Sequence, residues 1–383
     1  MATLKTRFLG INFPNPFVLA AGPPTARGEN IIEAFKAGWG GVVLKTIGIA
    51  PTGHPNPRLQ IIKSGRDKRG MIDIELFSDL TLDRWEEEID LVRASYPERP
   101  IIASIAAGNN PLEPHGVNGY EMNVGCPNIS SEENKGIKLG ENPEALKLAV
   151  GWVREATDLP VMVKLIPNVK DIAMLARVAA EAGADAVTTT NSLSGLAGID
   201  LDTFNPLPAV DGIGIFGGYG GPALKPVSLR CTAGVAKALR IPIAGCGGIE
   251  KWQDAAEYLA VGASVVELCT AVMWNGYELI KKLNRGFEAY LEKKGYEAPA
   301  EITGKALSSI VSFPDLNLSH KLVASINDSC DGCGICVKAC ASGGYQAIEM
   351  HNHTAQVDTI KCDGCGLCVC VCPQGSIMLK ARL

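Results

Sequence analysis

Apolar runs and helical segments alternate along the chain up to about residue 270. Each run is rich in β-branched or other apolar side chains, and helical periodicity follows most of them. The expected strands lie at 17–21, 41–45, 101–105, 119–123, 161–165, 186–190, 241–245 and 264–268. The expected helices lie at 29–37, 80–94, 143–157, 169–182, 226–239 and 251–260. Eight strands of the buried parallel type predict an α/β fold, a (β/α)8 TIM barrel, with an open doubly wound sheet as the alternative.

Two stretches depart from this repeat. Residues 108–118 separate the third and fourth runs and contain two prolines, so a full crossover helix does not fit there. Residues 273–295 have the pattern of one long amphipathic helix that closes the barrel. We therefore place the barrel at 1–295, a linker with some helical character at 296–328 and a second domain at 329–383.

Composition narrows the possible partners. The 383 residues are 46% hydrophobic and 20% charged, with a formal net charge of −5, as in a folded chain with a large core. Lys and Arg form no basic stripe, which excludes nucleic acid as the expected partner. No apolar run approaches the roughly 18 residues of a membrane helix, and the N-terminal segment does not resemble a signal peptide. We expect a cytoplasmic protein without membrane contact.

Nine of the thirteen cysteines lie between residues 330 and 372, in two similar halves. Each half contains the spacing C-x2-C-x2-C-x3-C, in which three thiolates bind one cubane and the fourth reaches the other cluster. The tail therefore predicts a ferredoxin-like domain with two 4Fe–4S clusters. One cluster is assigned to Cys330, Cys333, Cys336 and Cys372, and the other to Cys362, Cys365, Cys368 and Cys340.

Two alternative interpretations of the tail are a structural zinc site, because paired C-x2-C motifs also bind zinc, and a degenerate module without metal. Cys370 lies between two ligands and is expected to be a packed or backup thiol and not a ninth ligand. His351 and His353 alternate in the hairpin between the halves, where a solvated turn is the expected role. Because iron–sulfur clusters carry single electrons, another site in the chain must use them.

Polar residues and glycines follow the predicted barrel strands, where barrel enzymes carry their chemistry. They include two lysines, several amides, one thiol and three groups of glycines. Lys164 could stabilise an anionic reduced flavin ring, and the glycine amides after the last strands could bind a phosphate. Singly, a solvated lysine and an ordinary turn at Gly247 and Gly248 explain these residues; together they favour a flavin site.

The segment Gly212–Gly217 matches the dinucleotide pattern G-x-G-x-x-G. It follows no predicted strand and opens no predicted helix, so the required context is absent. We interpret it as a glycine-rich loop over the site and expect no nicotinamide binding by this chain.

Cys126 is the candidate proton donor or acceptor. Reduction of an activated C=C bond by a flavin delivers hydride to one carbon, and the neighbouring carbon needs a proton. A thiol with an ordinary pKa of about 8.5 can act in either direction. Asn123 and Asn128 flank Cys126 and favour a polar pocket over a buried structural cysteine. Core packing is the role expected for Cys231, Cys246 and Cys269.

These motifs together resemble dihydropyrimidine dehydrogenases and, more distantly, the flavin barrels of class 1 dihydroorotate dehydrogenases. The likeness lies in EMNVGCPN (121–128), VMVKLIPNVKDI (161–172), TTTNSLSGLAG (188–198), YGGPALKPVSLR (219–230) and the cysteine tail. It covers nearly the whole chain, in the form of a pyrimidine-reducing subunit without the family's flavin/NAD(P)H half.

The resemblance implies FMN, the general acid/base Cys126 and a set of contacts. The positions implied for FMN are Ala21, Lys45, Lys164, Thr190, Gly221, Gly247, Gly248 and Thr270. The positions implied for substrate are Asp73, Glu75, Phe77, Asn123, Asn191 and Ser192. The chain departs from the family's pattern in three places: the helix after Asn109 is mostly missing, Gly125 replaces a serine, and Asp73 replaces an amide.

The sequence thus predicts an oxidoreductase that acts on the C5=C6 bond of a pyrimidine-like ring in either direction. A partner flavoprotein that binds FAD and NAD(P)H, or a ferredoxin, would exchange electrons with it, and we expect an oligomer. The alternatives are a dihydroorotate-type dehydrogenase, a reductase of another conjugated cyclic amide, and a non-catalytic electron-transfer subunit.

Overall fold

The computed structural model describes residues 2–48, 50–51, 53–106, 112–126, 139–319 and 321–382. The chain divides into two compact units, Met1–Ser309 and Ile310–Leu383. In the described part of the chain, no helix is both long and apolar enough to cross a bilayer.

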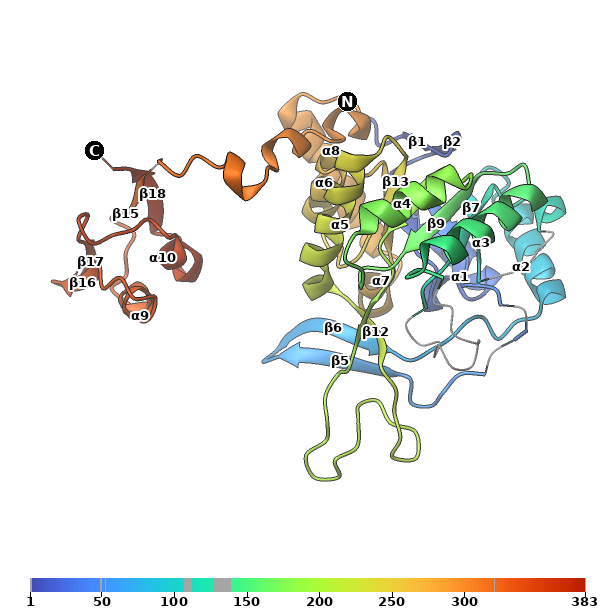
Figure 1. Ribbon diagram of the computed structural model, residues 1–383, viewed down its shortest axis with the longest axis horizontal. Coiled ribbons are helices and arrows are strands. Elements are labelled where there is room, and N and C mark those ends of the chain that lie inside the picture. Colours follow the sequence, from blue (N-terminus) through green and yellow to red (C-terminus); the bar gives the residue numbers. More distant parts are fainter. Residues whose placement is uncertain are drawn as a thin grey trace. The chain divides into compact units, whose positions relative to one another are not determined.

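The first unit is built around a closed barrel of eight parallel strands (Figure 1). The strands follow one another around the barrel in chain order, and each of the eight predicted runs supplies one of them. They are β3 (Phe17–Leu19), β4 (Gly41–Val43), β7 (Ile101–Ile105), β8 (Gly119–Asn123), β9 (Val161–Leu165), β10 (Ala186–Thr189), β13 (Ile243–Cys246) and β14 (Val265–Leu268). The predicted TIM barrel is confirmed, and the open doubly wound sheet is excluded.

Amphipathic helices connect most of these strands. They are α1 (Gly28–Ala37), α2 (Leu82–Ser95), α3 (Pro143–Ala156), α4 (Ile172–Glu181), α5 (Lys225–Ala238) and α6 (Trp252–Ala260). Side chains of Thr81, Asn142 and Asp171 accept hydrogen bonds from backbone N–H groups in the first turns of α2, α3 and α4. Between β7 and β8, the described residues contain only a 3-10 turn, η2 (Glu113–His115), as the short connection predicts. Asn109 lies outside the described residues.

The predicted single helix over 273–295 is wrong. The structure has two helices, α7 (Thr270–Asn275) and α8 (Leu279–Lys294). Gly276, with φ of 76° and ψ of 171°, ends α7 in an extended, positive-φ conformation that glycine adopts most readily. The apolar periodicity continues past this break, so the pattern alone did not reveal it. Three 3-10 turns follow: η4 (Pro299–Ile302), η5 (Leu307–Ser309) and η6 (Phe313–Asp315).

The barrel interior changes from apolar to polar along its axis. At the N-terminal end, inward side chains such as Val18, Val43 and Met162 pack together. The hairpin of β1 (Thr6–Phe8) and β2 (Ile11–Phe13) adds Phe8 and Phe13 to this cluster. One inward layer further along the strands, the side chains are charged or hydroxylated: Glu121, Lys164, Thr188 and Glu267. The polar end of the interior is therefore the end where the strands finish.

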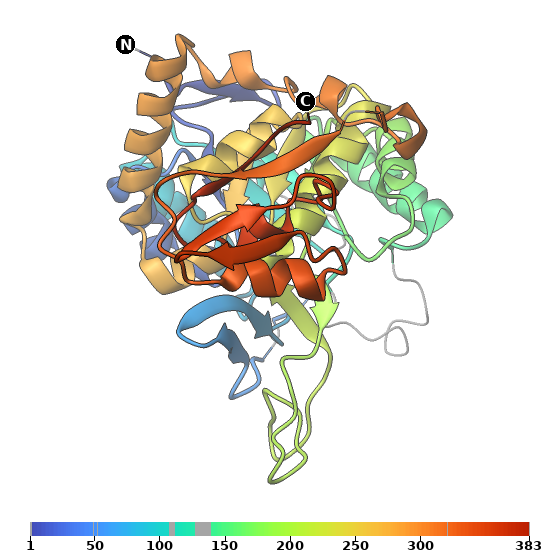
Figure 2. The same cartoon turned by 90° about the vertical axis from the view of Figure 1, so that its left-hand side faces the viewer.

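The first unit also contains a second sheet, which the sequence pattern does not predict. Its four antiparallel strands have the order β11 (Leu193–Gly195), β12 (Gly217–Gly220), β6 (Asp67–Asp73), β5 (Leu59–Ser64). The register places Asp73 beside Gly218. Figures 1 and 2 show β5, β6 and the long 196–216 connection extending away from the barrel. Gly212–Gly217 thus leads into a strand, and α5 begins only at Lys225.

The second unit repeats one small motif (Figure 2). Strand β15 (Leu322–Ile326) pairs with β18 (Ile377–Ala381), and β16 (Ile348–His351) pairs with β17 (Thr354–Val357). Two short helices, α9 (Ile335–Ser342) and α10 (Leu367–Val371), each begin one residue before the third cysteine of their half, Cys336 or Cys368. Small apolar residues such as Ala324, Ala347 and Ala355 form its core with buried cysteines. His351 and His353 are exposed at the β16–β17 turn, as a solvated turn predicts.

Candidate functional site: a cavity at the strand ends of the barrel

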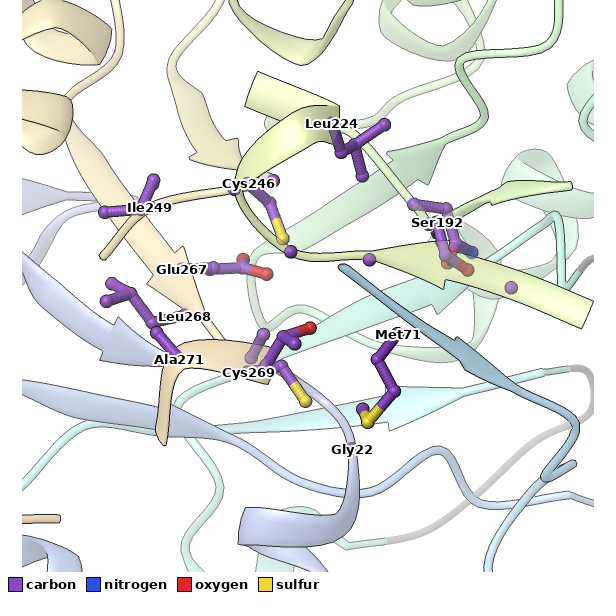
Figure 3. A pocket seen from close by; sticks show the side chains of 18 of the residues that line it. Gly22, Met71, Ser192, Leu224, Cys246, Ile249, Glu267, Leu268, Cys269 and Ala271 are labelled. Carbon is purple, nitrogen blue, oxygen red and sulfur yellow. Dashed lines mark hydrogen bonds between the residues drawn. The ribbon is translucent and has the colours of Figure 1, made fainter. Parts of the chain in front are cut away.

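One cavity lies at the C-terminal ends of β3, β10, β13 and β14 (Figure 3). The empty space within it, including the part open to solvent, is about 810 Å³. Ten of the predicted residues line it: Ala21, Asp73, Lys164, Thr190, Asn191, Ser192, Gly221, Gly247, Gly248 and Thr270. Five others, Lys45, Glu75, Phe77, Asn123 and Cys126, are not in the lining. Asn128 lies outside the described residues.

Glycines form one wall of the cavity, next to the start of α5. A Cβ atom on Gly248 would come within 2.6 Å of the Lys225 backbone nitrogen, and its φ of +71° already disfavours other residues. This close approach leaves backbone N–H groups near a helix N-terminus, where phosphate groups bind well. The wall therefore fits the phosphate of a flavin nucleotide.

Lys164 lies inside the barrel between two carboxyl groups. Its Nζ donates to Glu267 Oε2 at 2.8 Å and to Glu121 Oε1 at 3.3 Å, and all three side chains are buried. Burial opposes the charge of Lys164, but the two carboxyl groups outweigh it and raise the Lys164 pKa well above its ordinary value. Burial, helped by the neighbouring Glu267, raises the pKa of Glu121 to about 8. A flavin ring in the cavity would meet a lysine that is firmly charged.

Glu121 and Glu267 were not among the predicted site residues. Both interrupt apolar strand runs, in GYEMN and SVVEL. An acid in a fully buried strand needs a partner, so this interruption was the available signal. Thr188 on β10 was also missed, and its hydroxyl donates to Glu121 Oε2 at 2.7 Å.

A second charged group borders the cavity near β6. Lys45 Nζ and Arg58 Nε both donate to the Glu75 carboxylate, each at 2.5 Å. Burial opposes ionisation of Glu75, but Lys45 and then Arg58 outweigh it and hold the Glu75 pKa below its ordinary value. Asp73 Oδ1 accepts the Glu75 backbone N–H at 2.7 Å, and burial raises the Asp73 pKa to about 6. Asp73 is thus an acidic group held in place at the cavity wall, with a pKa of about 6, not far below neutral pH.

Two asparagines connect the cavity to the loop that carries Cys126. Asn191 Nδ2 donates to Asn123 Oδ1 and to the Gly125 carbonyl, both at 2.9 Å. Asn123 Nδ2 donates in turn to Thr46 Oγ1 at 3.0 Å. Cys126 follows Gly125 directly and is half-buried. The amides therefore fix the backbone on which the predicted proton donor stands.

The expectation of core packing is correct for Cys231 but wrong for Cys246 and Cys269. Cys231 is fully buried within the core on α5. Cys246 and Cys269 line the cavity, and Figure 3 shows their side chains on either side of Glu267. Cys246 is the last residue of β13, and Cys269 directly follows β14. Both thiols therefore stand at strand ends, where the cavity lies. Burial raises the Cys269 pKa to about 12, which keeps this thiol uncharged.

In the second unit, two small cavities each collect four cysteines. Cys330, Cys333, Cys336 and Cys372 line one, with an empty volume of about 310 Å³. Cys340, Cys362, Cys365 and Cys368 line the other, of about 370 Å³. Backbone N–H groups of Ala324, Ala347 and Ser376 point at Cys362, Cys340 and Cys372 within 3.4 Å, as thiolate ligands require. Cys370 is exposed, so the expectation that it packs is wrong, and it lines neither cavity.

This grouping suits cubane clusters better than single metal ions. Each cavity takes three thiols from one half of the tail and one from the other. The eight thiols therefore fit two 4Fe–4S clusters, with three ligands of each cluster from one half and the fourth from the other.

The fold and the cavities define a barrel oxidoreductase joined to an iron–sulfur domain. The chain belongs to the dihydroorotate dehydrogenase family, which matches residues 3–291, and residues 324–379 match a 4Fe–4S dicluster domain. The family implies a flavin, and the dicluster domain implies two clusters.

Named relatives fall into two groups. The NAD-dependent dihydropyrimidine dehydrogenase subunit PreA of Escherichia coli (strain K12) is 34% identical over 364 residues, 92% of this chain and 88% of the relative. The dihydroorotate dehydrogenase B (NAD(+)) catalytic subunit of Thermococcus kodakarensis is 36% identical over 318 residues, 80% of this chain and 99% of the relative. The chloroplastic dihydropyrimidine dehydrogenase (NADP(+)) of Arabidopsis thaliana is 31% identical over 330 residues, 80% of this chain and 78% of the relative.

Proposed function

We propose that this chain is an FMN- and iron–sulfur-dependent subunit that acts on the C5=C6 bond of a neutral pyrimidine-like ring. The observation that supports this proposal is the charge of the side chains around Asp73, where the substrate ring would lie. Lys45 and Arg58 are both paired with Glu75, and Asp73 stands in the cavity wall. When Asp73 is ionised, the two acids Glu75 and Asp73 balance the two cations Lys45 and Arg58, so no net positive charge is left there. A ring that bears its own carboxylate, such as dihydroorotate, would therefore face the Asp73 carboxylate without an excess cation to balance its charge.

The lengths of the relatives support the same choice. The alignment with the dihydroorotate dehydrogenase subunit uses 99% of that relative but only 80% of this chain. The alignment with the dihydropyrimidine dehydrogenase subunit uses 92% of this chain, which extends into the cysteine tail. The combination of barrel and tail is therefore matched by a relative named for dihydropyrimidines.

The roles of the residues follow from their positions. FMN would be held by the glycine wall and Lys164, with Ala21, Thr190 and Thr270 beside it and Lys45 as a further predicted contact. A bound flavin supplies hydride exchange with one ring carbon. Asn191 and Ser192, with Asn123, Asp73, Glu75 and Phe77 as the other predicted contacts, would orient the ring. Cys126 would give the proton to the neighbouring carbon or take it away.

Electrons would pass between the flavin and an outside partner through the two clusters. Two relatives carry names of subunits, which supports a partner protein that binds FAD and NAD(P)H, with a ferredoxin as the other candidate. In each cluster cavity one thiol, Cys333 or Cys365, is exposed, which suits exchange of single electrons with another protein.

A substrate panel with photoreduced holoenzyme tests the proposal. Uracil or thymine should reoxidise the flavin under anaerobic conditions, and orotate should do so much more slowly. Faster reoxidation by orotate would show a dihydroorotate-type enzyme instead. Reoxidation by a protein acceptor alone, with every ring inactive, would show a non-catalytic electron-transfer subunit.

A further inference from the structure

Among the described residues, two buried acids and one buried base lie together in the barrel interior. Glu121, Lys164 and Glu267 have exposed fractions of 0%, 5% and 2%. Among the described residues, Lys164 is the only cation in contact with either carboxyl group. Glu267 also lines the flavin cavity, as Figure 3 shows. A charge imbalance is thus built into the floor of that cavity.

The two carboxyl groups share the same partners. Lys164 Nζ contacts Glu267 Oε2 and Glu121 Oε1, and Thr188 Oγ1 lies 2.7 Å from Glu121 Oε2 and 3.3 Å from Glu267 Oε1. A threonine hydroxyl has one proton to donate, so it satisfies one of the two acids at a time. The geometry therefore joins the acids into one titrating unit and not two independent groups.

The other groups that face this unit carry no compensating charge. The Cys246 thiol on β13 faces it, and burial raises the Cys246 pKa far above neutrality, so this thiol stays uncharged. The Cys269 thiol, beyond β14, is also uncharged. With both acids ionised, Lys164, Glu121 and Glu267 would together carry a charge of −1 away from water, which is costly. With one acid protonated, the three side chains are neutral.

We infer that Glu121 and Glu267 hold one proton between them at neutral pH, and that the pair gains or loses this proton when the charge in the cavity beside Lys164 changes. The second part rests on the proposed flavin site, whereas the first part concerns the protein alone. The raised pKa of Glu121, about 8, agrees with this inference. The pair would act as a positioning group for charge at the flavin, through Lys164, and not as a catalytic residue.

Infrared spectroscopy of the oxidised holoenzyme tests the shared proton. Titration from pH 5 to pH 10 should remove one protonated-carboxyl band with a midpoint near pH 8. The band should be absent from Glu267→Gln and from Glu121→Gln, because the remaining acid pairs with Lys164 and stays ionised. Asp73→Asn is the matched control: it should keep this band and lose only a band that titrates near pH 6.

Proton uptake on photoreduction tests the coupling. Above pH 8, photoreduction of the wild-type enzyme should bind as much as one more proton per flavin than photoreduction of the Glu267→Gln variant. Glu257→Gln, which changes a half-exposed acid paired with Lys225, should behave as wild type. Equal uptake in wild type and Glu267→Gln would overturn the coupling.

The inference and the proposed function can fail separately. A band near pH 8 that persists in both Gln variants, or none in wild type, would overturn the shared proton, whatever the substrate panel shows. An inactive ring panel with the band intact would instead reject the proposed function. Because two variants probe the pair, misfolding of one leaves the other as the test.

Discussion

The barrel and the cysteine tail build their sites in opposite ways. All eight cluster cysteines lie within residues 330–372, and most neighbours in each set are three residues apart. The barrel cavity is lined by residues from Ala20 to Met273, which come from separate strand ends. The tail site can therefore be predicted from the local spacing of its cysteines, whereas the barrel site forms only when the barrel folds and brings its strand ends together.

The two regions also differ in where they keep their polar chemistry. In the tail, Cys333 and Cys365 reach the surface. In the barrel, the side chains of Lys164, Glu121 and Glu267 are buried. Exposed thiols suit exchange of electrons with a partner, and buried charges suit the holding of protons. If this comparison is correct, each region can be disabled while the other keeps its own half of the reaction.

The largest effect should come from Cys340→Ala. Because Cys340 lines the cavity of Cys362, Cys365 and Cys368, the variant should lose that cluster, about half of the iron and sulfide, and turnover with the electron partner. Reduction or oxidation of the flavin by the ring substrate should persist. Iron and sulfide analysis with EPR checks the change, and Cys370→Ala should keep both clusters. Loss confined to the cluster of Cys330, Cys333 and Cys336 would contradict the ligand grouping.

The opposite separation should follow from Cys126→Ala. This variant should keep FMN and both clusters but lose about 10²–10⁴-fold in the chemical step, the usual contribution of a positioned acid or base. Rapid-reaction kinetics with the ring substrate measure the loss, and Cys126→Ser should recover part of it at high pH. Unchanged turnover at saturating substrate, with chemistry shown to be rate-limiting, would remove Cys126 from the mechanism.

A stability effect should distinguish the buried charges of the barrel from charges at the surface. Lys164→Met leaves two buried acids without a cation, which should destabilise the barrel by about 3–5 kcal/mol. The folded-state pKa of an unpaired buried acid is raised, so its stabilising contribution is present at low pH and lost as the pH rises. The difference from wild type should therefore grow from pH 6 to pH 9.

Tryptophan fluorescence can follow this unfolding, because all five tryptophans lie in the barrel unit. Lys281→Met is the matched control, since Lys281 pairs with Glu278 at the surface, and it should change stability by less than about 1 kcal/mol. A loss as small as that of Lys281→Met, or one that is greater at acid pH, would contradict the role assigned to Lys164.

Sequence patterns predicted the parts of the barrel that depend on short-range regularity. All eight strands were predictable because parallel barrel strands are apolar on both faces. The break at Gly276 was not, because the apolar spacing of the two helices happens to stay in phase. Strands β5, β6, β11 and β12 were missed because segments such as DKRGMID show no clean alternation of polar and apolar residues.

The same limit applied to the cavity. Its glycines and Lys164 could be predicted from their place after strands. Glu121 and Glu267 are 146 positions apart and meet only because β8 and β14 both face the barrel axis. Core packing is the wrong prediction for Cys246 and Cys269 because the sequence does not show which side of a strand end a thiol faces. Contacts across the barrel needed the structure.

The smallest predicted effect concerns Asp73, where the barrel cavity meets the substrate. An ionised carboxylate only accepts hydrogen bonds, whereas an amide at the same place both donates and accepts, as the C=O and N–H edge of a pyrimidine requires. A lost bond to a ring carbonyl costs about 1–3 kcal/mol, so Asp73→Asn should raise kcat/KM for uracil or thymine by about 10–100-fold. A ring with an extra N–H at this edge, as in an amino-substituted or hydantoin-like compound, should gain nothing.

The pH dependence should follow the same carboxyl group. Burial raises the Asp73 pKa to about 6, so the protonated form that can donate a hydrogen bond becomes the major form as the pH falls below 6. Wild-type activity on uracil should therefore improve between pH 8 and pH 5.5, and that of Asp73→Asn should stay flat over the same range. Asp67→Asn, an exposed position on the same strand, is the control and should follow wild type. Two results together would contradict this role: wild-type activity that does not change with pH, and pyrimidine turnover that Asp73→Asn leaves unchanged or lowers. They would mean that Asp73 does not contact the ring. The choice of substrate would then rest on Asn191, Ser192 and the paired cations alone.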